Sequence, residues 1–218
     1  MPALARHDLA NAVAAMLTAA ETLRERRHDL PDETVDELLD RMVARGRSIH
    51  RLLLDLTALA RSPDGGVDVA TEPVRVADAV AAALDEVDEH ADTAVSVAVP
   101  SGLCALADPF RLQQVLVNLI GNALRHGGPA VRIRARRDGD QVTISVSDDG
   151  GAIPDEVATR MFEPWARGPD SQRLGGSGLG LAVVRTFITA MGGTVSHHRG
   201  RTGTEFRVTL PAARPPTA

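Results

Sequence analysis

A histidine near the start of the chain is the residue best suited to covalent chemistry. The segment HDLAN places His7 beside Asp8 and four residues before Asn11. Residues four apart lie on one face of a helix, so the His7 imidazole and the Asn11 amide would project together. An exposed histidine on a helix is by itself an ordinary solvated residue. Whether His7 has a chemical function must therefore be judged together with the other polar groups of the chain.

A second polar group occurs within the amphipathic segment DPFRLQQVLVNLIGNALRHG. Asn118 and Asn122 are again four residues apart, and Arg125 and His126 follow one turn later. Amide oxygens on one helix face can hold a hydrated magnesium ion and phosphate oxygens, because oxygen ligands suit this hard cation. Taken singly, asparagines on a helix are usually surface residues.

An acidic residue followed by glycines could bind a flat base. In SVSDDGGAIP a predicted strand ends at Asp148 and runs directly into Gly150 and Gly151. The carboxylate can accept a hydrogen bond from an exocyclic amine, and the glycines let the backbone approach a base closely. A plain β-turn would explain the same residues.

A glycine-rich helix start could bind phosphate. In RLGGSGLGLAVV, Gly175, Gly176, Gly178 and Gly180 precede and open a predicted helix. The first N–H groups of a helix have no partners within it and attract anions. Neither GxGxxG after a strand nor GxxxxGK(S/T) is present, which argues against Rossmann and P-loop nucleotide sites.

A helical hairpin is expected to carry the histidine. Apolar residues at alternating steps of four and three predict one helix from residue 9 and, after Pro31, a second one. The two seams contain Leu9, Val13, Met16, Ala20 and Leu23, then Val35, Leu38, Met42, Arg45, Ile49, Leu52, Leu56 and Leu59, with Arg45 as one charged interruption. An antiparallel hairpin would bury far more apolar surface by pairing with a second copy, so half of a dimeric four-helix bundle is predicted.

A second domain is expected after the hairpin. SPDGG breaks the helical pattern beyond Arg61 and predicts a linker. Helices are predicted at 76–90, 108–126 and 178–191, strands at 93–100, 103–107, 130–148 (a hairpin), 193–198 and 204–210, and irregular chain at 149–176. An open sheet with helices on one face, an α+β sandwich, would satisfy this order.

The composition limits the classes of partner that we expect for this protein. The 218 residues are 44% hydrophobic and 24% charged, and no run reaches the length of about 18 to 20 apolar residues that a membrane span needs. We therefore expect a cytoplasmic protein without membrane contact. A net charge of -5 and an aromatic content of 2% argue against nucleic acid as a partner. Cys104 is the only cysteine, which excludes an internal disulfide.

The order of these segments resembles that of the sensor histidine kinases of two-component systems. HDLAN resembles their phosphoacceptor box, DPFRLQQVLVNLIGNALRHG the asparagine box and SVSDDGGAIP the first glycine box. MFEPWARG resembles the phenylalanine box, GGSGLGLAVV the second glycine box and GGTVSHHRGRTGTEFRVTLP the closing strands. The resemblance implies a dimerisation and phosphotransfer hairpin at 1–62, a linker at 63–75, an ATP-binding α/β sandwich of the GHKL (Bergerat) type at 76–212 and a tail at 213–218.

The resemblance also implies a reaction. His7 would attack the terminal phosphorus of ATP, with Asp8 accepting the other ring N–H to fix the tautomer. The phosphoryl group would then pass to an aspartate on the receiver domain of a response regulator. Asn11 matches the position that orients a water for dephosphorylating that receiver, so a reverse phosphatase activity is expected as well.

The same resemblance assigns the cofactors, ATP and Mg²⁺, to the second domain. Asn122 would bind the metal, Asn118 and Arg125 would lie along the phosphates, and Asp148 would bind the adenine amine. The complete expected site is Asn118, Asn122, Arg125, His126, Asp148, Gly150, Ala152, Phe162, Gly176, Ser177, Gly178, Leu179, Gly180 and Thr204.

The glycine-rich segment is expected to act as a mobile lid. Gly176, Gly178 and Gly180 would supply its mobility and its phosphate contacts, and Phe162 and Trp165 would pack against it. Two features depart from the family pattern. Ala152 adds a methyl group near the base, and no proline follows His7 closely. Because the chain starts just before His7 with no sensor segment, we expect a fragment of a longer protein or a partner that delivers the input.

Other functions remain open. ATPases with the same nucleotide fold need a general base, usually a glutamate four residues before the metal asparagine. Asn118 stands there and cannot take a proton, so direct hydrolysis is disfavoured. A non-catalytic histidine phosphotransfer adaptor with a vestigial ATP domain is the main alternative; Ala152 favours it, whereas Asn122 and Asp148 argue against it. A serine-directed kinase of the anti-sigma-factor type would not need His7.

Overall fold

The computed structural model describes residues 3–60, 67–87, 93–151, 153–166, 177–199 and 203–214, with the backbone alone for residues 3–8. The chain divides into two compact units, Met1–Thr57 and Ala58–Ala218. Within the described parts of the chain, we find no helix with both the length and the apolar character needed to cross a membrane.

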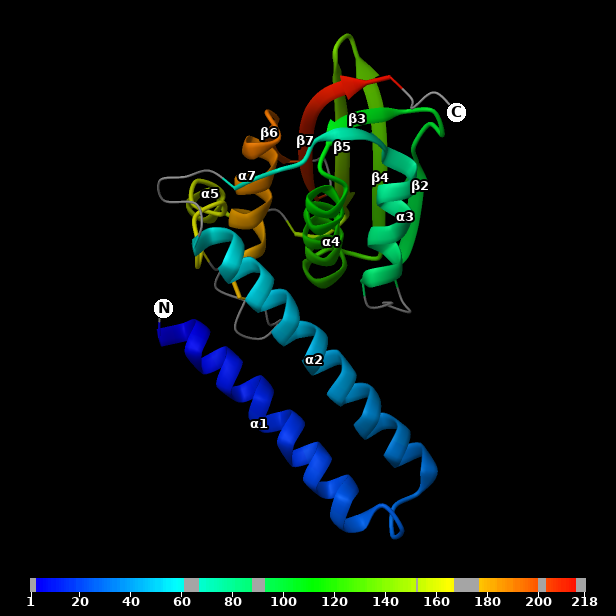
Figure 1. Ribbon diagram of the computed structural model, residues 1–218, viewed down its shortest axis with the longest axis vertical. Helices are drawn as coiled ribbons and strands as arrows, with labels where there is room; N and C mark the ends of the chain where they lie inside the picture. The colour runs from blue at the N-terminus through cyan, green and yellow to red at the C-terminus, as the bar shows by residue number, and fades with distance from the viewer. Residues whose placement is uncertain are drawn as a thin grey trace. The chain divides into compact units, whose positions relative to one another are not determined.

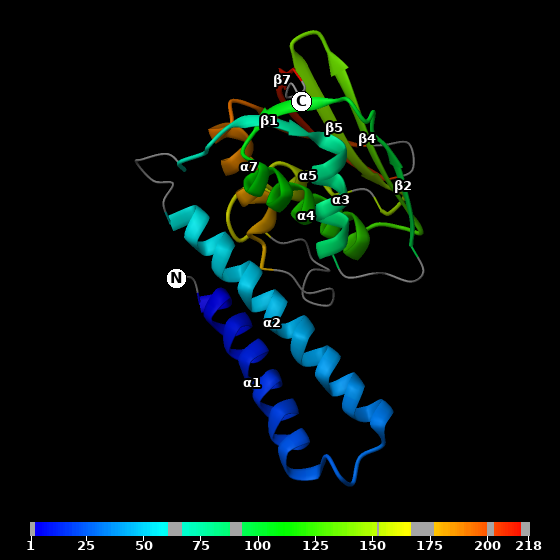
Figure 2. The ribbon, with the colours of Figure 1, turned by 45° about the vertical axis from the view of Figure 1, so that its right-hand side comes forward.

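Two long helices form the first unit. Helix α1 spans Ala3–Arg26 and helix α2 spans Asp32–Ala60, and they run antiparallel (Figures 1 and 2). The N–H of Val35 donates to the carbonyl of Pro31 at 3.1 Å, so Pro31 immediately precedes the second helix. The predicted helical hairpin is confirmed.

The hairpin buries only part of its apolar surface. Val35 and Leu52 of the predicted seam are buried. Val13 of the same seam is exposed, and Leu17, one turn further along α1, is 56% exposed. On α2, the large exposed apolar side chains are Leu39, Val43, Leu53 and Leu54. One hairpin therefore leaves apolar side chains on both helices in contact with water.

A seven-stranded sheet forms the second unit, in the order β1-β3-β7-β5-β4-β2, with β6 also paired to β7. The strands are β1 Glu72–Arg75, β2 Ala94–Ala98, β3 Cys104–Ala107, β4 Ala130–Asp138, β5 Gln141–Asp148, β6 Thr194–Arg199 and β7 Thr204–Ala213. Among the strands that the structure describes, β2 and β4 pair in parallel and the other pairs are antiparallel. The predicted hairpin is β4–β5, and Gly139 in its turn has φ 58°.

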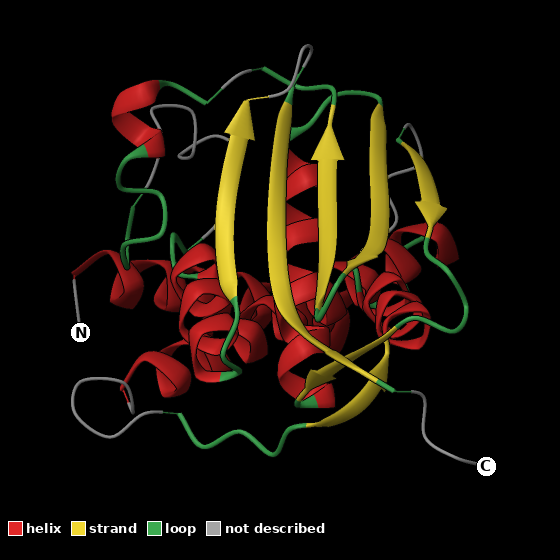
Figure 3. Ribbon diagram, turned by 90° about the horizontal axis from the view of Figure 1, so that it is seen from above, coloured by secondary structure: helices red, strands yellow, loops and turns green. Residues whose placement is uncertain are grey.

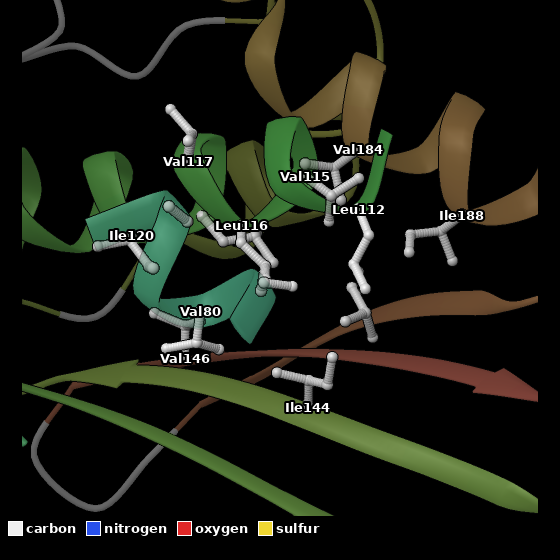
Figure 4. Close-up of a cluster of buried hydrophobic side chains, with 14 of the residues drawn as sticks. Val80, Leu112, Val115, Leu116, Val117, Ile120, Ile144, Val146, Val184 and Ile188 are labelled. Atoms are coloured by element: carbon white, nitrogen blue, oxygen red, sulfur yellow. The ribbon is translucent and has the colours of Figure 1, made fainter. Parts of the chain in front are cut away.

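Helices cover one face of this sheet (Figure 3). They are α3 Val76–Glu86, α4 Pro109–His126 and α7 Gly180–Ala190. Strand β5 alternates buried residues such as Ile144 and Val146 with the more accessible Ser145 and Ser147. Figure 4 shows Ile144 and Val146 packed below Leu116 and Ile120 of α4 and Val80 of α3. The predicted α+β sandwich is confirmed.

Two short elements differ from the sequence-based expectation. Residues Glu72–Arg75 fell within the predicted linker, but they form the edge strand β1 paired with β3. With Pro73 inside it and four residues in all, this strand has too little alternation to be detected locally, and its pairing with β3 stabilises it. Helix α5, Asp155–Ala158, lies in a segment expected to be irregular. Ala213, assigned to the tail, closes β7 opposite Cys104.

Candidate functional site

Helix α4 positions the polar residues predicted to bind magnesium and phosphate. Asp108 caps its start, because one carboxylate oxygen accepts from the N–H of Arg111 at 3.1 Å. The other oxygen accepts from the N–H of Ala70 at 3.0 Å, which ties the chain before β1 to the helix. The predicted N-cap is confirmed. The apolar side of α4 is buried against the sheet, and Asn118 and Asn122 remain partly accessible.

Asn118 connects α4 to the glycine-rich start of α7. Its Nδ2 donates to the carbonyl of Gly180 at 3.4 Å. A Cβ atom at Gly180 would lie 3.3 Å from the Asn118 Oδ1, so a glycine permits this approach. The amide face of α4 and the amino end of α7 therefore lie together. The first N–H groups of α7 can bind an anion beside Asn118.

Asn122 and Arg125 lie one turn apart on α4 and contact each other. The Arg125 Nη2 donates to the Asn122 Oδ1 at 3.4 Å. That oxygen is the predicted magnesium ligand. No group of three His, Cys, Asp or Glu side chains suited to a metal occurs in the described part of the chain. The Asn122 amide oxygen is a hard donor of the kind that Mg²⁺ prefers.

Asp148 ends β5 as a buried carboxylate. It accepts hydrogen bonds from the Gly150 N–H at 2.9 Å and from the Thr204 backbone N–H. Desolvation raises the pKa of the Asp148 carboxyl above its ordinary value; these hydrogen bonds and His126 oppose the rise, and Asp149 adds to it. A carboxylate held in this way is oriented to accept further hydrogen bonds from an amine.

Asp149 is engaged elsewhere, although it directly follows Asp148. Its carboxylate makes a bidentate ion pair with Arg132 of β4, with N–O distances of 2.6 and 2.9 Å. Successive residues of an extended chain project to opposite sides, which explains the separation. Of the two neighbouring aspartates, Asp148 is thus the one oriented toward the candidate site.

Glycines let the backbone close around Asp148. A Cβ atom at Gly127, directly after α4, would lie 2.6 Å from the Asp148 Cβ, and one at Gly150 would lie 2.8 Å from the Gly127 Cα. A Cβ at Gly203 would overlap the Asp148 carbonyl oxygen. The sequence identified Gly150 but missed Gly127 and Gly203. Their place in the sequence was the available indication, because Gly127 directly follows a predicted helix and Gly203 directly precedes a predicted strand.

His126 ends α4 next to this carboxylate. Partial desolvation lowers its pKa below the ordinary histidine value, Arg125 lowers it further, and Asp148 opposes the shift. The imidazole is therefore neutral at pH 7.

The second glycine box is described from Ser177 onward. The Ser177 Oγ accepts from the Leu179 N–H at 3.2 Å, and the Leu179 side chain is buried. Gly178 has φ 70°, and its carbonyl accepts from the N–H of Trp165 at 2.8 Å. The phenylalanine box and the start of α7 are thus joined. Gly175, Gly176 and Ala152, which the sequence also singled out, lie outside the described residues.

Phe162 of the phenylalanine box belongs to a row of three ring side chains in contact. The rings of Phe162 and Phe206 meet edge to face with centroids 6.3 Å apart, and His197 lies 5.6 Å from Phe206. Phe162 was predicted as a site residue, whereas Phe206 and His197 were not. Thr204, predicted as a site residue, is buried at the start of β7, and its backbone N–H donates to the Asp148 carboxylate.

The residues predicted for the phosphoacceptor box belong to the first unit. His7 and Asp8 lie within α1, but their side chains are outside the described part of the structure. Asn11 is exposed on the same helix. Their roles therefore stay predictions.

Comparison with known proteins defines the class of the second unit. Residues 107–214 match the family model "Histidine kinase-, DNA gyrase B-, and HSP90-like ATPase". The buried carboxylate, the amides of α4 and the glycine-rich start of α7 all fall within this range. Residues 107–214 of the second unit therefore form a domain of this class.

Curated relatives and solved structures narrow the class to one family. The chain is 32% identical over 189 residues to the signal transduction histidine-protein kinase AfsQ2 of Streptomyces coelicolor, covering 86% of this chain and 35% of the relative. It is 33% identical over 217 residues to the sensor histidine kinase TrcS of Mycobacterium tuberculosis, covering 95% and 42%. The mycobacterial sensor histidine kinase MprB matches with a TM-score of 0.59 and 26% identity over 67% of this chain and 99% of that one. Full-length ShkA in complex with AMPPNP matches with a TM-score of 0.68 and 25% identity over 97% and 46%.

This chain belongs to the sensor histidine kinases. It spans between about a third and a half of the length of the two curated relatives described above. The resemblance stated from the sequence is confirmed.

Proposed function

We propose that this chain phosphorylates itself on His7 with ATP and then transfers the phosphoryl group to an aspartate of a response regulator receiver domain. The observation that carries the proposal is the arrangement of three polar side chains along α4, within a domain that matches the histidine kinase-like ATPase family model. Asn118 contacts Gly180 at the start of α7, Asn122 lies one turn further along α4, and Asp148 packs against Gly127 directly after α4. The similar protein ShkA was solved with an ATP analogue, AMPPNP, which supports ATP as the nucleotide.

The nucleotide would lie along α4. Asp148 would accept a hydrogen bond from the adenine amine, and the Asn118 amide and the first N–H groups of α7 would bind the phosphates. The Arg125 guanidinium, which contacts the Asn122 Oδ1, would turn onto a phosphate oxygen. Asn122 would be the magnesium ligand, and the metal would neutralise charge on the phosphates.

The phosphoryl transfer is a displacement at phosphorus. An unprotonated nitrogen of His7 would form the new N–P bond, the bond from the γ-phosphorus to the bridging oxygen would break, and ADP would leave. Asp8 would accept the remaining ring N–H and thereby fix the tautomer. In the second step the receiver aspartate would take the phosphoryl group, and Asn11 would serve the reverse phosphatase reaction.

The assembly we propose is a homodimer formed through the hairpin. Exposed apolar residues on both helices, Leu17 and Val43 among them, support it, because pairing two hairpins would remove these side chains from water. The use of ATP and of a receiver domain as substrates leads us to propose that this part of the protein works in the cytoplasm.

The test is labelling with γ-³²P-ATP and magnesium. We expect label on the chain that is lost in acid and retained in base, as a phosphohistidine requires. His7→Ala and Asn122→Ala should carry none. His28→Ala and His50→Ala are matched controls, because both histidines are exposed on the same hairpin, and both variants should label like the wild type. Label that survives in His7→Ala would refute the assigned nucleophile.

A second measurement separates the kinase from an adaptor without catalysis. Trp165 is the only tryptophan, and its backbone N–H donates to the carbonyl of Gly178 within the second glycine box. Its fluorescence should therefore change when magnesium and ATP bind, both in the wild type and in His7→Ala. An adaptor with a vestigial ATP domain would show neither labelling nor this change.

A further inference from the structure

Two aspartates follow each other at the end of β5, and one of them faces the candidate site. Asp148 is the last residue of the strand, and Asp149 comes directly after it. Because the two side chains are identical, residue type alone does not decide which of them points inward. A shift of one residue in a strand exchanges the two faces, so it would exchange the two carboxylates. The position of the chain at this point therefore decides which aspartate is available to an adenine amine.

The strand pairing that fixes this position comes to an end here. The ladder between β4 and β5 closes with Val131 opposite Asp148. One further backbone hydrogen bond, from the Asp149 N–H to the Ala130 carbonyl, is long at 3.3 Å. The two residues that follow are glycines, which have no side chains to pack. A side-chain contact at Asp149 is therefore well placed to hold the chain in register.

Arg132 of β4 makes that contact. Its Nη1 donates to the Asp149 Oδ1 at 2.6 Å, and its Nη2 donates to the Asp149 Oδ2 at 2.9 Å. In the register Arg132 lies opposite Ser147, two residues before Asp149, so its side chain and that of Asp149 project from the same face of the sheet, opposite the helices. A bidentate pair of this kind fixes the orientation of the carboxylate as well as its distance.

Another acidic side chain on this outer face has its own partner. Glu205 of β7 lies in the same cross-strand row as Arg132, because both are paired with Ser147 of β5. The Glu205 carboxylate, however, contacts the Arg207 guanidinium at 2.8 Å. Arg132 and Arg207 thus bind one carboxylate each, and the pairing of Arg132 with Asp149 is specific.

The pair is also more sheltered than a second arginine–aspartate pair on the same strand. The side chains of Arg132 and Asp149 are 39% and 25% exposed. Those of Arg136 and Asp138, near the turn of the β4–β5 hairpin, are 67% and 72% exposed and 3.3 Å apart. Water and salt screen an exposed pair more strongly, and a single contact orients its partner less well. The Arg132–Asp149 pair is therefore the better suited of the two to hold the backbone.

We propose that Arg132 is a positioning residue for the nucleotide: by holding Asp149 on the outer face, it keeps the Asp148 carboxylate on the inner face, where it can meet an adenine amine. This inference rests on the proposed function. Gly127 packs against the Asp148 side chain, and Arg132 acts on the next residue from the opposite side of the sheet. Loss of the pair would therefore weaken recognition of the base rather than binding of the phosphates.

The experiment compares magnesium-ADP with the magnesium complex of inosine diphosphate (IDP). IDP has the same ribose and phosphates, but a carbonyl oxygen replaces the adenine amine, so the donor proposed for Asp148 is missing. Calorimetry gives a dissociation constant for each nucleotide, and the ratio of the two measures recognition of the base. An unfolded fraction lowers the binding stoichiometry but leaves this ratio unchanged. We expect the wild type to prefer ADP by about tenfold or more.

Breaking the pair should reduce this preference. We expect Arg132→Gln to lower it about three- to tenfold, mainly through weaker binding of ADP. Asp149→Ala removes the other half of the pair and should give a similar loss. The double variant should lose no more than either single variant, because both changes break one interaction. Arg132→Lys keeps the charge without the planar fork and should give an intermediate preference.

Arg136→Gln is the matched control, because it removes an arginine–aspartate pair from the same strand at the end far from Asp148. It should keep the wild-type preference. The same loss in this variant would overturn the inference, as would an unchanged preference in Arg132→Gln or Asp149→Ala, equal weakening of ADP and IDP, or losses that add in the double variant. If Arg132→Gln does not fold, Asp149→Ala compared with Arg136→Gln decides the question.

The wild type separates this inference from the proposed function. Any of these contrary results, in a protein that itself prefers ADP, would leave the kinase proposal standing. A wild-type protein that binds ADP and IDP equally would overturn the inference together with the role assigned to Asp148. A wild-type protein that binds neither nucleotide would overturn the proposed function as well.

Discussion

Asp148 illustrates how a single residue can be suited to binding at the expense of stability. Its carboxylate is buried, and desolvation raises its pKa even though two backbone N–H groups donate to it. A carboxyl group whose pKa is raised by folding disfavours the folded state once the pH exceeds its ordinary titration range. The charge is therefore retained against its energetic cost, which is typical of residues that bind ligands.

Asp148→Asn should separate binding from stability. The amide oxygen can still accept from the N–H groups of Gly150 and Thr204, but the buried charge is gone. We expect the free energy of unfolding to increase by about 1 kcal/mol at neutral pH, which corresponds to a rise in Tm of about 2–4 °C. Magnesium-ADP binding should weaken at least tenfold, since one carboxylate acceptor is lost. Thermal unfolding and calorimetry measure the two effects.

The pH dependence provides the control for this variant. Below the ordinary carboxyl range, at about pH 3 to 4, Asp148 is protonated in both the folded and the unfolded protein. The stability difference between the wild type and Asp148→Asn should therefore shrink as the pH falls toward that range. A difference that grows in acid would contradict the assigned cause of the pKa shift.

The elements of the site meet at a junction between the end of α4 and the end of β5. Gly127 follows α4 directly, and a Cβ atom there would lie 2.6 Å from the Asp148 Cβ. The helix can reach the carboxylate only because this position has no side chain. The junction also fixes His126, which precedes Gly127, near the same carboxylate.

Gly127→Ala should therefore disturb both the fold and the site. The added methyl group would force α4 and β5 apart, at a cost of about 1–3 kcal/mol, and should weaken magnesium-ADP binding. Gly102→Ala is the matched control, because nothing lies within 4 Å of its added Cβ. That change should be neutral or stabilising by about 0.4–1 kcal/mol. Equal stability of the two variants in urea unfolding would show that Gly127 does not make this close contact.

At the scale of the whole molecule, a single hairpin leaves apolar side chains of both helices exposed. Leu17 on α1 is 56% exposed and Val43 on α2 is 52% exposed, and each has another exposed apolar residue, Val13 or Leu39, one turn before it. Residues one turn apart share a face, so each helix presents a small apolar stripe to solvent. Such stripes are typical of surfaces that bind other proteins.

Charge placed on these stripes should separate the protomers. We expect Leu17→Glu and Val43→Glu to shift the chain from a dimer to a monomer in size-exclusion chromatography with light scattering, because a buried unpaired charge is unfavourable. Phe110→Ser is the control: Phe110 is 80% exposed, but it belongs to α4 in the other unit. A wild-type chain that is monomeric at micromolar concentrations would refute the dimer.

The sequence by itself determined the elements and much of the site chemistry. Apolar periodicity predicted both hairpin helices and α4, and turn chemistry predicted the β4–β5 hairpin. These features follow from neighbours a few residues apart. The spacing of Asn118 and Asn122 and the place of Asp148 before its glycines belong to the same local scale, which is why motif order already indicated the family.

Only the tertiary structure decided which distant residues meet. Asn118 contacts Gly180 from 62 positions away, Gly203 closes on Asp148, and His197 faces Phe206 through the register of β6 on β7. The short strand β1 likewise exists through its pairing with β3. A shift of one residue in a strand register would turn every side chain to the other face. Register is set by the packed core and by long-range pairing, which local patterns do not encode.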